Sequence, residues 1–336
     1  MAFDGITIAA VTKELKETLE GGRISKIAQP EADELLLTVK TPAGQRRLCI
    51  CASASLPLIY LTDENKTSPM QAPGFCMLLR KHIGSGRIIS ISQPKMERII
   101  RFEIEHLDEM GDLCSKTLIV ELMGKHSNII FCDDSDRIID SIKHISAQTS
   151  SVREVLPGRD YFIPDTMHKL DPLTVAQEDF ITALRTKGGP LSKALYTSFT
   201  GISPVVAEEI CYLAALESRM TAEDLSGDML VHLYRQFSYY MEQVSLGDFS
   251  PAIYYEGREP KEFSALPLSH FSNYRREEFP SISQVIRTYY SSRESLTRIR
   301  QKSADLRHVV QTALERIRKK YDLQSRQLRD LSLIHI

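Results

Sequence analysis

A carboxylate and a guanidinium stand side by side at Glu97-Arg98, inside a basic stretch of the chain. Residues 76–101 hold six Lys or Arg residues against one acid, a net charge of +5. Phosphates would repel a carboxylate here, so its useful role is to accept hydrogen bonds from base donors while the arginine holds phosphate or base. The alternative is a solvated helix face with strand edges. The basic residues are Arg80, Lys81, Arg87, Lys95, Arg98 and Arg101.

A second candidate segment runs from Glu121 to Ile130, where a polar turn separates two β-like runs. The pattern predicts a hairpin in which Gly124 and Asn128 tolerate unusual backbone dihedrals. The single histidine of this turn does not make a metal site, the other histidines are isolated, and no GxSxG elbow supports a nucleophile. We therefore expect no catalytic residue and no bound metal.

The segment Thr200-Gly-Ile-Ser-Pro204 predicts that one helix ends and the next begins. Glycine suits the bend, Ser203 suits the N-cap and proline suits the first helical position. Such a turn could bind a phosphate through backbone N–H groups. Glu208 and Glu209 follow in the next helix, so structural packing is the alternative.

Basic residues also dominate the C-terminal part of the chain. Residues 287–330 carry twelve Lys or Arg against five acids, a net charge of +7, while the rest of the chain has a net charge of −9. Apolar residues recur there at spacings of three, four or seven, as in a coiled-coil seam. The charge favours an RNA or acidic-protein contact, with a solvated coiled-coil exterior as the alternative. The candidate contacts are Arg298, Arg300, Arg316, Arg318, Lys319 and Lys320.

The spacing of apolar residues predicts the elements that position these candidates. The first part is expected to contain a helix at 7–20, strands at 23–28, 34–40 and 46–51, a helix at 73–83, and strands at 87–93, 98–106, 116–122, 128–132 and 137–143. Helices are expected at 174–186, 190–199, 204–215 and 221–246, then a β-like patch at 252–265 and a long helix from about 283. Hairpin-length links predict an α+β fold with a mostly antiparallel sheet.

Four regions follow from this pattern. They are an α+β domain at 1–170, a helical region with a short β patch at 171–281, the first helix of a coiled coil at 282–330, and a final hexapeptide at 331–336. The hexapeptide is the in-frame translation of a transposon-end adapter, CTGTCTCTTATACACATC, so we expect the natural gene to continue past Asp330.

The 336 residues have an ordinary globular composition, with 42% hydrophobic and 26% charged residues. No run approaches the roughly 18 apolar residues that cross a bilayer, and no basic leader precedes the apolar stretch at 6–11. Six scattered cysteines without a CxxC pair predict buried thiols in a reducing compartment. We expect a cytoplasmic protein without a membrane partner.

The motifs together resemble those of the NFACT family, often catalogued as fibronectin-binding protein A, and specifically its RqcH/NEMF branch. The resemblance covers residues 1–330. It rests on Phe3-Asp4-Gly5, Glu97-Arg98, the run from Glu121 to Ile130, the turn from Phe199 to Pro204, and the basic helix. It implies an NFACT-N domain similar in shape to the N-terminal domain of formamidopyrimidine-DNA glycosylases, a helix-hairpin-helix module and a coiled-coil arm. An NFACT-R domain normally follows, and the chain stops before it.

The resemblance implies ribosome-associated quality control. Members bind a large ribosomal subunit obstructed by peptidyl-tRNA and recruit alanyl-tRNA for template-free alanine tailing of the stalled chain. The family's tRNA-contacting pair is Asp-Arg, which corresponds here to Glu97 and Arg98. The expected tRNA-binding residues are Glu97, Arg98, Lys125, Asn128, Arg80 and Lys81. The basic residues of the arm are expected to bind ribosomal RNA. The ribosome forms the peptide bond, so neither an enzyme nor a cofactor is expected.

Two other functions remain open from the sequence. The older family name suggests a fibronectin-binding surface adhesin. The implied fold also suggests a DNA glycosylase-like protein, but those enzymes use an N-terminal proline with a neighbouring glutamate, whereas this chain presents Ala2 and Phe3. We therefore do not expect a DNA partner.

Overall fold

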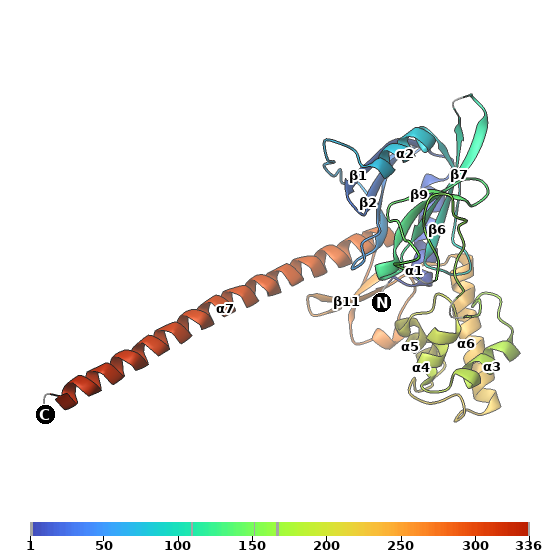
Figure 1. Cartoon of the computed structure of the whole chain (residues 1–336). Coiled ribbons are helices and arrows are strands. Elements are labelled where there is room, and N and C mark those ends of the chain that lie inside the picture. Colours follow the sequence, from blue (N-terminus) through green and yellow to red (C-terminus); the bar gives the residue numbers. More distant parts are fainter. Residues whose placement is uncertain (1–2, 109, 151, 166–167, 335–336) are drawn as a thin grey trace. The chain divides into compact units, whose positions relative to one another are not determined.

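The computed structural model describes residues 3–108, 110–150, 152–165 and 168–334, with side chains omitted at 293–309 and 330–334. The chain divides into two units, residues 1–287 and 288–336. The first unit holds both sheets and all the shorter helices (Figure 1). The second is formed by most of one long helix. The predicted boundary between residues 170 and 171 stays a prediction.

A nine-stranded antiparallel sheet forms the centre of the first unit, with strand order β4-β3-β2-β1-β5-β6-β7-β8-β9. Its strands are β1 (Arg23–Glu31), β2 (Glu34–Thr41), β3 (Gly44–Cys51), β4 (Leu58–Thr62), β5 (Arg87–Ser92), β6 (Ile99–Leu107), β7 (Leu113–Glu121), β8 (Asn128–Cys132) and β9 (Ile138–Ser141). Most neighbours in the sheet are also neighbours in sequence, because short hairpins join them. The chain leaves this order once, between β4 and β5, where helix α2 (Gly74–Ile83) intervenes.

Helix α1 (Gly5–Leu19) buries an apolar stripe that includes Ile8, Val11 and Leu15.

Helices α3 (Gln177–Lys187), α4 (Leu191–Ser198), α5 (Pro204–Leu213) and α6 (Gly227–Leu246) form the helical region. The rings of Phe180, Phe199 and Phe237 pack together there, with centroids 4.8 to 5.1 Å apart. A second sheet has the order β11 (Glu259–Ser264), β10 (Ala252–Glu256) and β12 (Arg275–Glu278).

The structure confirms the predicted α+β class and the antiparallel sheet. Strands β4 and β12 were not predicted from the sequence. β12 has the sequence Arg-Arg-Glu-Glu, which has no apolar alternation, and it pairs with the edge of β10 that β11 leaves open. The thiols of Cys51 and Cys114 are half-buried, whereas the other four cysteines are buried as predicted. None of the described helices is both long and apolar enough to cross a membrane.

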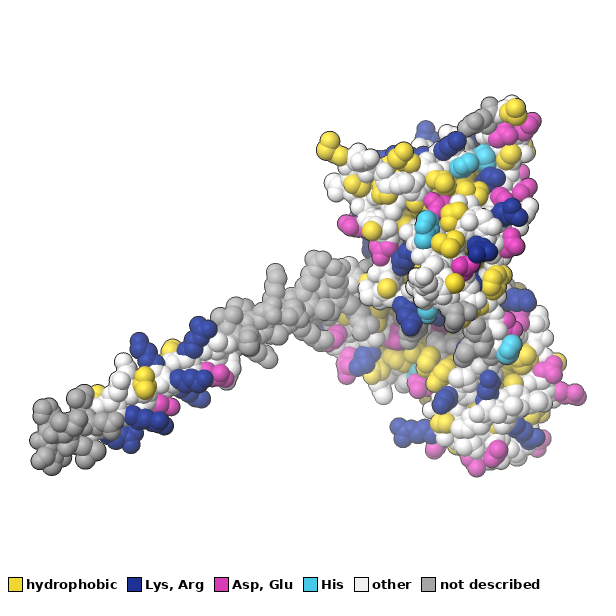
Figure 2. Space-filling model, viewed as in Figure 1, with side chains coloured by type: hydrophobic (Ala, Val, Ile, Leu, Met, Phe, Trp, Pro, Cys, Tyr) yellow, Lys and Arg dark blue, Asp and Glu magenta, His cyan; other side chains and the backbone are white. Residues whose placement is uncertain are grey.

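The predicted long helix is confirmed as α7 (Ile282–Ile334). In its described part the apolar stripe is exposed, and the basic side chains lie along the same helix (Figure 2). The stripe residues Val310, Leu314, Ile317, Tyr321 and Leu328 are 47% to 72% exposed. Their spacing fits a coiled-coil seam, and the coiled coil itself stays a prediction.

The carboxylate of Asp4 joins the starts of two helices that are far apart in sequence. Its Oδ1 accepts a hydrogen bond from the backbone N–H of Thr7 (2.8 Å), which caps α1. Its Oδ2 accepts a hydrogen bond from Ser203 Oγ (2.6 Å), and that hydroxyl also caps α5 through the N–H of Val206. Burial raises the pKa of Asp4 above its usual value, although these hydrogen bonds oppose the shift.

Removing both acceptor oxygens of Asp4 should destabilise the fold more than replacing its carboxylate with a neutral amide, which keeps one acceptor. We expect Asp4→Ala to lower the free energy of unfolding by about 1–3 kcal/mol, because two helix starts lose an acceptor. Because the folded pKa is raised, ionisation of Asp4 costs stability as pH rises through that range. The free energy of unfolding of Asp4→Asn, relative to that of the native protein, should therefore be higher at neutral pH than at pH ~4. Urea unfolding at both pH values measures this; equal losses for both variants at both pH values would contradict it.

Candidate nucleic-acid interface

The turn that carries Glu97 and Arg98 connects β5 to β6 and has a fixed backbone. Lys95 and Met96 have φ values of 42° and 57°, which lie in the left-handed region. The N–H of Glu97 donates to the carbonyl of Pro94 (2.8 Å). The side-chain amide of Gln93 closes the turn by donating to the carbonyls of Gly5 (2.8 Å) and Glu97 (2.9 Å). The turn is thus held from both the sheet and the N-terminal segment.

Three of the predicted motifs meet at this turn, although they are far apart in sequence. The N–H of Gly5 donates to the carbonyl of Gly201 (3.0 Å). A Cβ atom added at Gly5 would lie 2.3 Å from the Met96 carbonyl oxygen, and one at Gly201 would lie 2.5 Å from the same atom. Gly201 also has a φ of 76°. Glycine is therefore required at both positions, because no side chain fits between the three backbones.

Glu97 and Arg98 are both half-buried at this junction. Burial is the main reason that the pKa of Glu97 is raised. The charges of Arg98 and Lys169 oppose this shift, and the charge of Asp165 adds to it. Burial lowers the pKa of Lys169, while the charge of Glu97 acts in the opposite direction. The Lys169 ammonium donates to the carbonyl of Tyr196 (2.8 Å). The sequence reasoning missed Lys169, because no local pattern connects it with the turn 72 residues earlier.

Lys125 lies at the same end of the sheet. It is in the 3₁₀ turn η1 (Gly124–His126), which follows β7. Strand β7 pairs with β6 so that Glu121 lies opposite Ile99, and the N–H of Leu122 donates to the carbonyl of Arg98 (2.9 Å). The side chain of Lys125 is exposed. The structure therefore brings Lys125 to the strand end next to Arg98.

Asn128 has a structural position that does not suit the predicted tRNA contact. It is only 2% exposed. Its Nδ2 donates to the carbonyl of Lys143 (2.9 Å), and its Oδ1 accepts from the N–H groups of Ile129 (2.9 Å) and Lys143 (3.1 Å). The amide of Asn128 is used within the fold, where it joins the start of β8 to Lys143 after β9, and this burial argues against the predicted tRNA contact.

Arg80 and Lys81 lie away from the turn, so the basic stretch 76–101 is not one patch. Both are exposed in the last turn of α2, and Arg80 Nε donates to the carbonyl of Ile27 (2.8 Å). Strand β5 begins after that helix and ends just before the turn at 93–98. Its six residues span about 20 Å. In Figure 1, α2 lies at the opposite end of the first unit from helices α3 to α6.

The arm residues can be placed only in part. Arg316, Arg318, Lys319 and Lys320 are exposed on α7. The side chains of Arg298 and Arg300 lie outside the described residues. In the described part of the chain, no group of three or more His, Cys, Asp or Glu side chains could hold a metal ion.

A buried ion pair supports the strand end that carries Arg98 and Lys125. Glu121, which is 1% exposed, pairs with Arg153 and accepts a hydrogen bond from the hydroxyl of Tyr161 (2.9 Å). The guanidinium of Arg153 also lies over the Tyr161 ring, 5.3 Å from its centroid. This cluster connects β7 to the segment after β9.

We expect Arg153→Ala to lower the free energy of unfolding by about 3–5 kcal/mol, because it leaves the Glu121 carboxylate buried without its partner. Arg159→Ala is the matched control, since Arg159 is exposed, pairs with Glu154 (2.8 Å) and should change stability little when removed. Chemical unfolding of both variants is the measurement. Similar losses for the two would show that Glu121 does not depend on Arg153.

The chain matches known proteins over most of its length. Residues 4–333 match a family described as "NFACT N-terminal and middle domains". The protein named "Rqc2 homolog RqcH" from Bacillus subtilis (strain 168) is 34% identical over 312 residues, which are 92% of this chain and 52% of that protein. The chain thus spans about half the length of the curated relatives it matches.

Two solved structures have the same fold. The N-terminal part of the fibronectin/fibrinogen-binding protein from Streptococcus suis has a TM-score of 0.70 at 33% identity. The fibrinogen binding protein from Staphylococcus aureus has a TM-score of 0.72 at 28% identity. Each match covers 86% of this chain and 99% of the other. The family match and the shared fold agree with the motifs, and the chain belongs to the NFACT family.

Proposed function

We propose that this chain is the RNA-binding part of a ribosome quality control factor. It binds a large ribosomal subunit obstructed by peptidyl-tRNA and recruits alanyl-tRNA, so that a template-free alanine tail marks the stalled chain for degradation. Its membership of the NFACT family supports this proposal. So do the names of its relatives, among them RqcH and the human "Ribosome quality control complex subunit NEMF", which is 25% identical over 194 residues.

The observation that carries the proposal is the junction of three distant segments around Glu97 and Arg98. Such a junction holds a guanidinium and a carboxylate in a fixed arrangement, as recognition of an RNA loop requires. Lys125 on the adjacent strand end adds an exposed positive charge for a phosphate. Lys169 follows Glu97 by 72 residues in the sequence, and the charge of each opposes the burial-driven pKa shift of the other.

Each side chain has a distinct role in this proposal. Arg98 bonds a phosphate or stacks on an unpaired base, because a planar guanidinium does both. Glu97 accepts hydrogen bonds from the donor edge of a base, which gives selectivity that a lysine or arginine alone does not. Lys125 contributes affinity that is independent of sequence and sensitive to salt.

The basic segment of α7 at 316–320 is proposed to bind ribosomal RNA. Arg316, Arg318, Lys319 and Lys320 are exposed together within five positions of one helix. Clustered charges of this kind displace counterions from RNA, so binding should weaken steeply as salt increases. The ribosome performs peptidyl transfer, and the chain contributes only binding and orientation. A cytoplasmic location and the absence of a DNA substrate belong to the same proposal.

Arg98→Ala should weaken binding of deacylated tRNA by about tenfold or more, because a charge-assisted hydrogen bond is lost. The measurement is fluorescence anisotropy with labelled tRNA at fixed salt. Glu97→Gln should keep much of the affinity and reduce discrimination between tRNAs, since it removes the anion but retains an acceptor. Arg258→Ala, at the exposed β10–β11 turn, is the matched control. Equal affinity of the Arg98→Ala and Arg258→Ala variants would contradict the proposal.

A further inference from the structure

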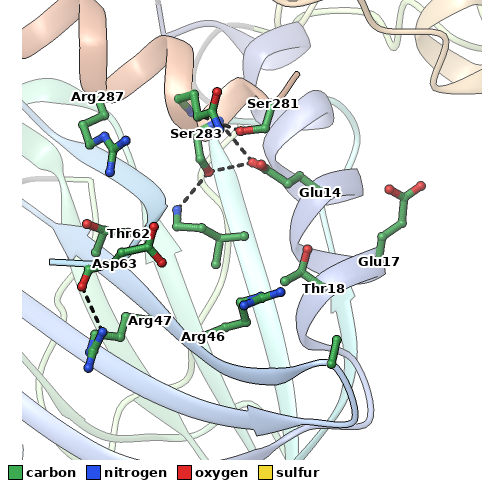
Figure 3. A pocket seen from close by; sticks show the side chains of 13 residues that line it. Glu14, Glu17, Thr18, Arg46, Arg47, Thr62, Asp63, Ser281, Ser283 and Arg287 are labelled. Carbon is green, nitrogen blue, oxygen red and sulfur yellow. Dashed lines mark hydrogen bonds between the residues drawn. The ribbon is translucent and has the colours of Figure 1, made fainter. Parts of the chain in front are cut away.

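A polar cavity of about 560 Å³ lies within the first unit, apart from the junction described above. It is open to solvent on one side and lined by α1, by β3 and β4 with the turns beside them, and by the start of α7 (Figure 3). The volume falls in the range of about 300–1,000 Å³ that is typical of small-molecule sites. The side chains that line it include Glu14, Glu17, Arg46, Arg47, Asp63, Ser283 and Arg287.

Two of the three acids around the cavity already have partners. Glu14 Oε2 accepts hydrogen bonds from the N–H of Ser283 (3.1 Å) and from its hydroxyl (2.6 Å). The same hydroxyl accepts a hydrogen bond from the N–H of Leu61 (2.8 Å), so this corner of the cavity is rigid (Figure 3). Glu17 pairs with Lys13 at 3.7 Å on the surface of α1.

The three arginines, in contrast, keep most of their donors available. Arg47 Nη1 donates to the backbone carbonyl of Asp63 (2.9 Å), which fixes its guanidinium, and Arg46 reaches only its neighbour's carbonyl (3.5 Å). Arg287 is half-buried, and among the described residues no hydrogen bond or ion pair involves its side chain. In Figure 3 its guanidinium points toward Thr62 and Asp63. Three arginines thus line the cavity, against one uncommitted carboxylate, that of Asp63.

We propose that this cavity binds a phosphate ester, with Arg46, Arg47 and Arg287 holding the phosphate of a ribonucleotide. Guanidinium groups match the geometry of phosphate oxygens through paired N–H donors. The Glu14 carboxylate has further lone pairs that can accept a hydrogen bond from a hydroxyl of the attached ribose. The same chemistry is offered by a free nucleotide and by a nucleotide within an RNA strand. The site does not depend on the tRNA contact at Glu97 and Arg98.

Isothermal titration calorimetry with 5′-AMP tests the proposal, with adenosine as the ligand that lacks only the phosphate. We expect saturable binding of AMP and none of adenosine. Arg287→Gln should weaken AMP binding by about tenfold, because one charge-assisted contact is lost. Arg258→Gln is the matched control and should bind as the native chain does. Unchanged AMP affinity in Arg287→Gln, or adenosine binding as tightly as AMP, would overturn the proposal.

A second arm distinguishes the source of the phosphate and separates this site from the proposed function. A short single-stranded RNA is titrated in the Arg98→Ala background, with and without Arg287→Gln. If the RNA competes with AMP, and Arg287→Gln lowers the RNA affinity below that of Arg98→Ala alone, the cavity holds an RNA phosphate. If AMP binds but the RNA does not compete, it holds a free nucleotide. Loss of the tRNA contact alone leaves the AMP titration unchanged, so the two proposals fail separately.

Discussion

The close approach of three backbones at Gly5, Met96 and Gly201 is the constraint on which the candidate interface depends. With glycine at two of the three positions, the Met96 carbonyl can lie where a side chain would otherwise stand. The contact brings the start of α1, the β5–β6 turn and the start of α5 together. Asp4 then links the two helix starts through Thr7 and Ser203. Glu97 and Arg98 follow Met96 directly, so their positions are set by this junction.

The basic residues of the chain lie on separate surfaces and act as separate electrostatic groups. The stretch 76–101 is basic as a whole, yet β5 separates the charges of α2 from those of the turn by about 20 Å. That distance exceeds the screening length of about 8 Å at physiological salt, so the two groups act independently. The three arginines around the cavity beside α7 form a further surface. An RNA partner would thus meet several modest contacts, which suits binding along an extended strand or loop.

Local patterns in the sequence predicted the hairpins, the start of α5 and the long helix, because those depend on neighbouring residues. The Ser-Pro start of α5 is an example, since capping is decided within one turn. The pairing of Asp4 with Ser203 and the approach of Lys169 to Glu97 depend on residues up to 199 positions apart. Burial of Asn128 likewise follows from its bonds to Lys143, which no local pattern reveals. Arg80 and Lys81 are close to Glu97 in sequence and lie on another part of the fold.

The most direct test of this account is site-specific cross-linking of bound tRNA. A photoreactive benzoylphenylalanine replaces Lys125 in one protein and Lys81 in another, and both positions are exposed. We expect tRNA to be cross-linked from position 125, beside Arg98, and much less from position 81. Cross-linking from position 81 with none from position 125 would contradict it, because the RNA would then lie at the end of the sheet away from the three-segment junction.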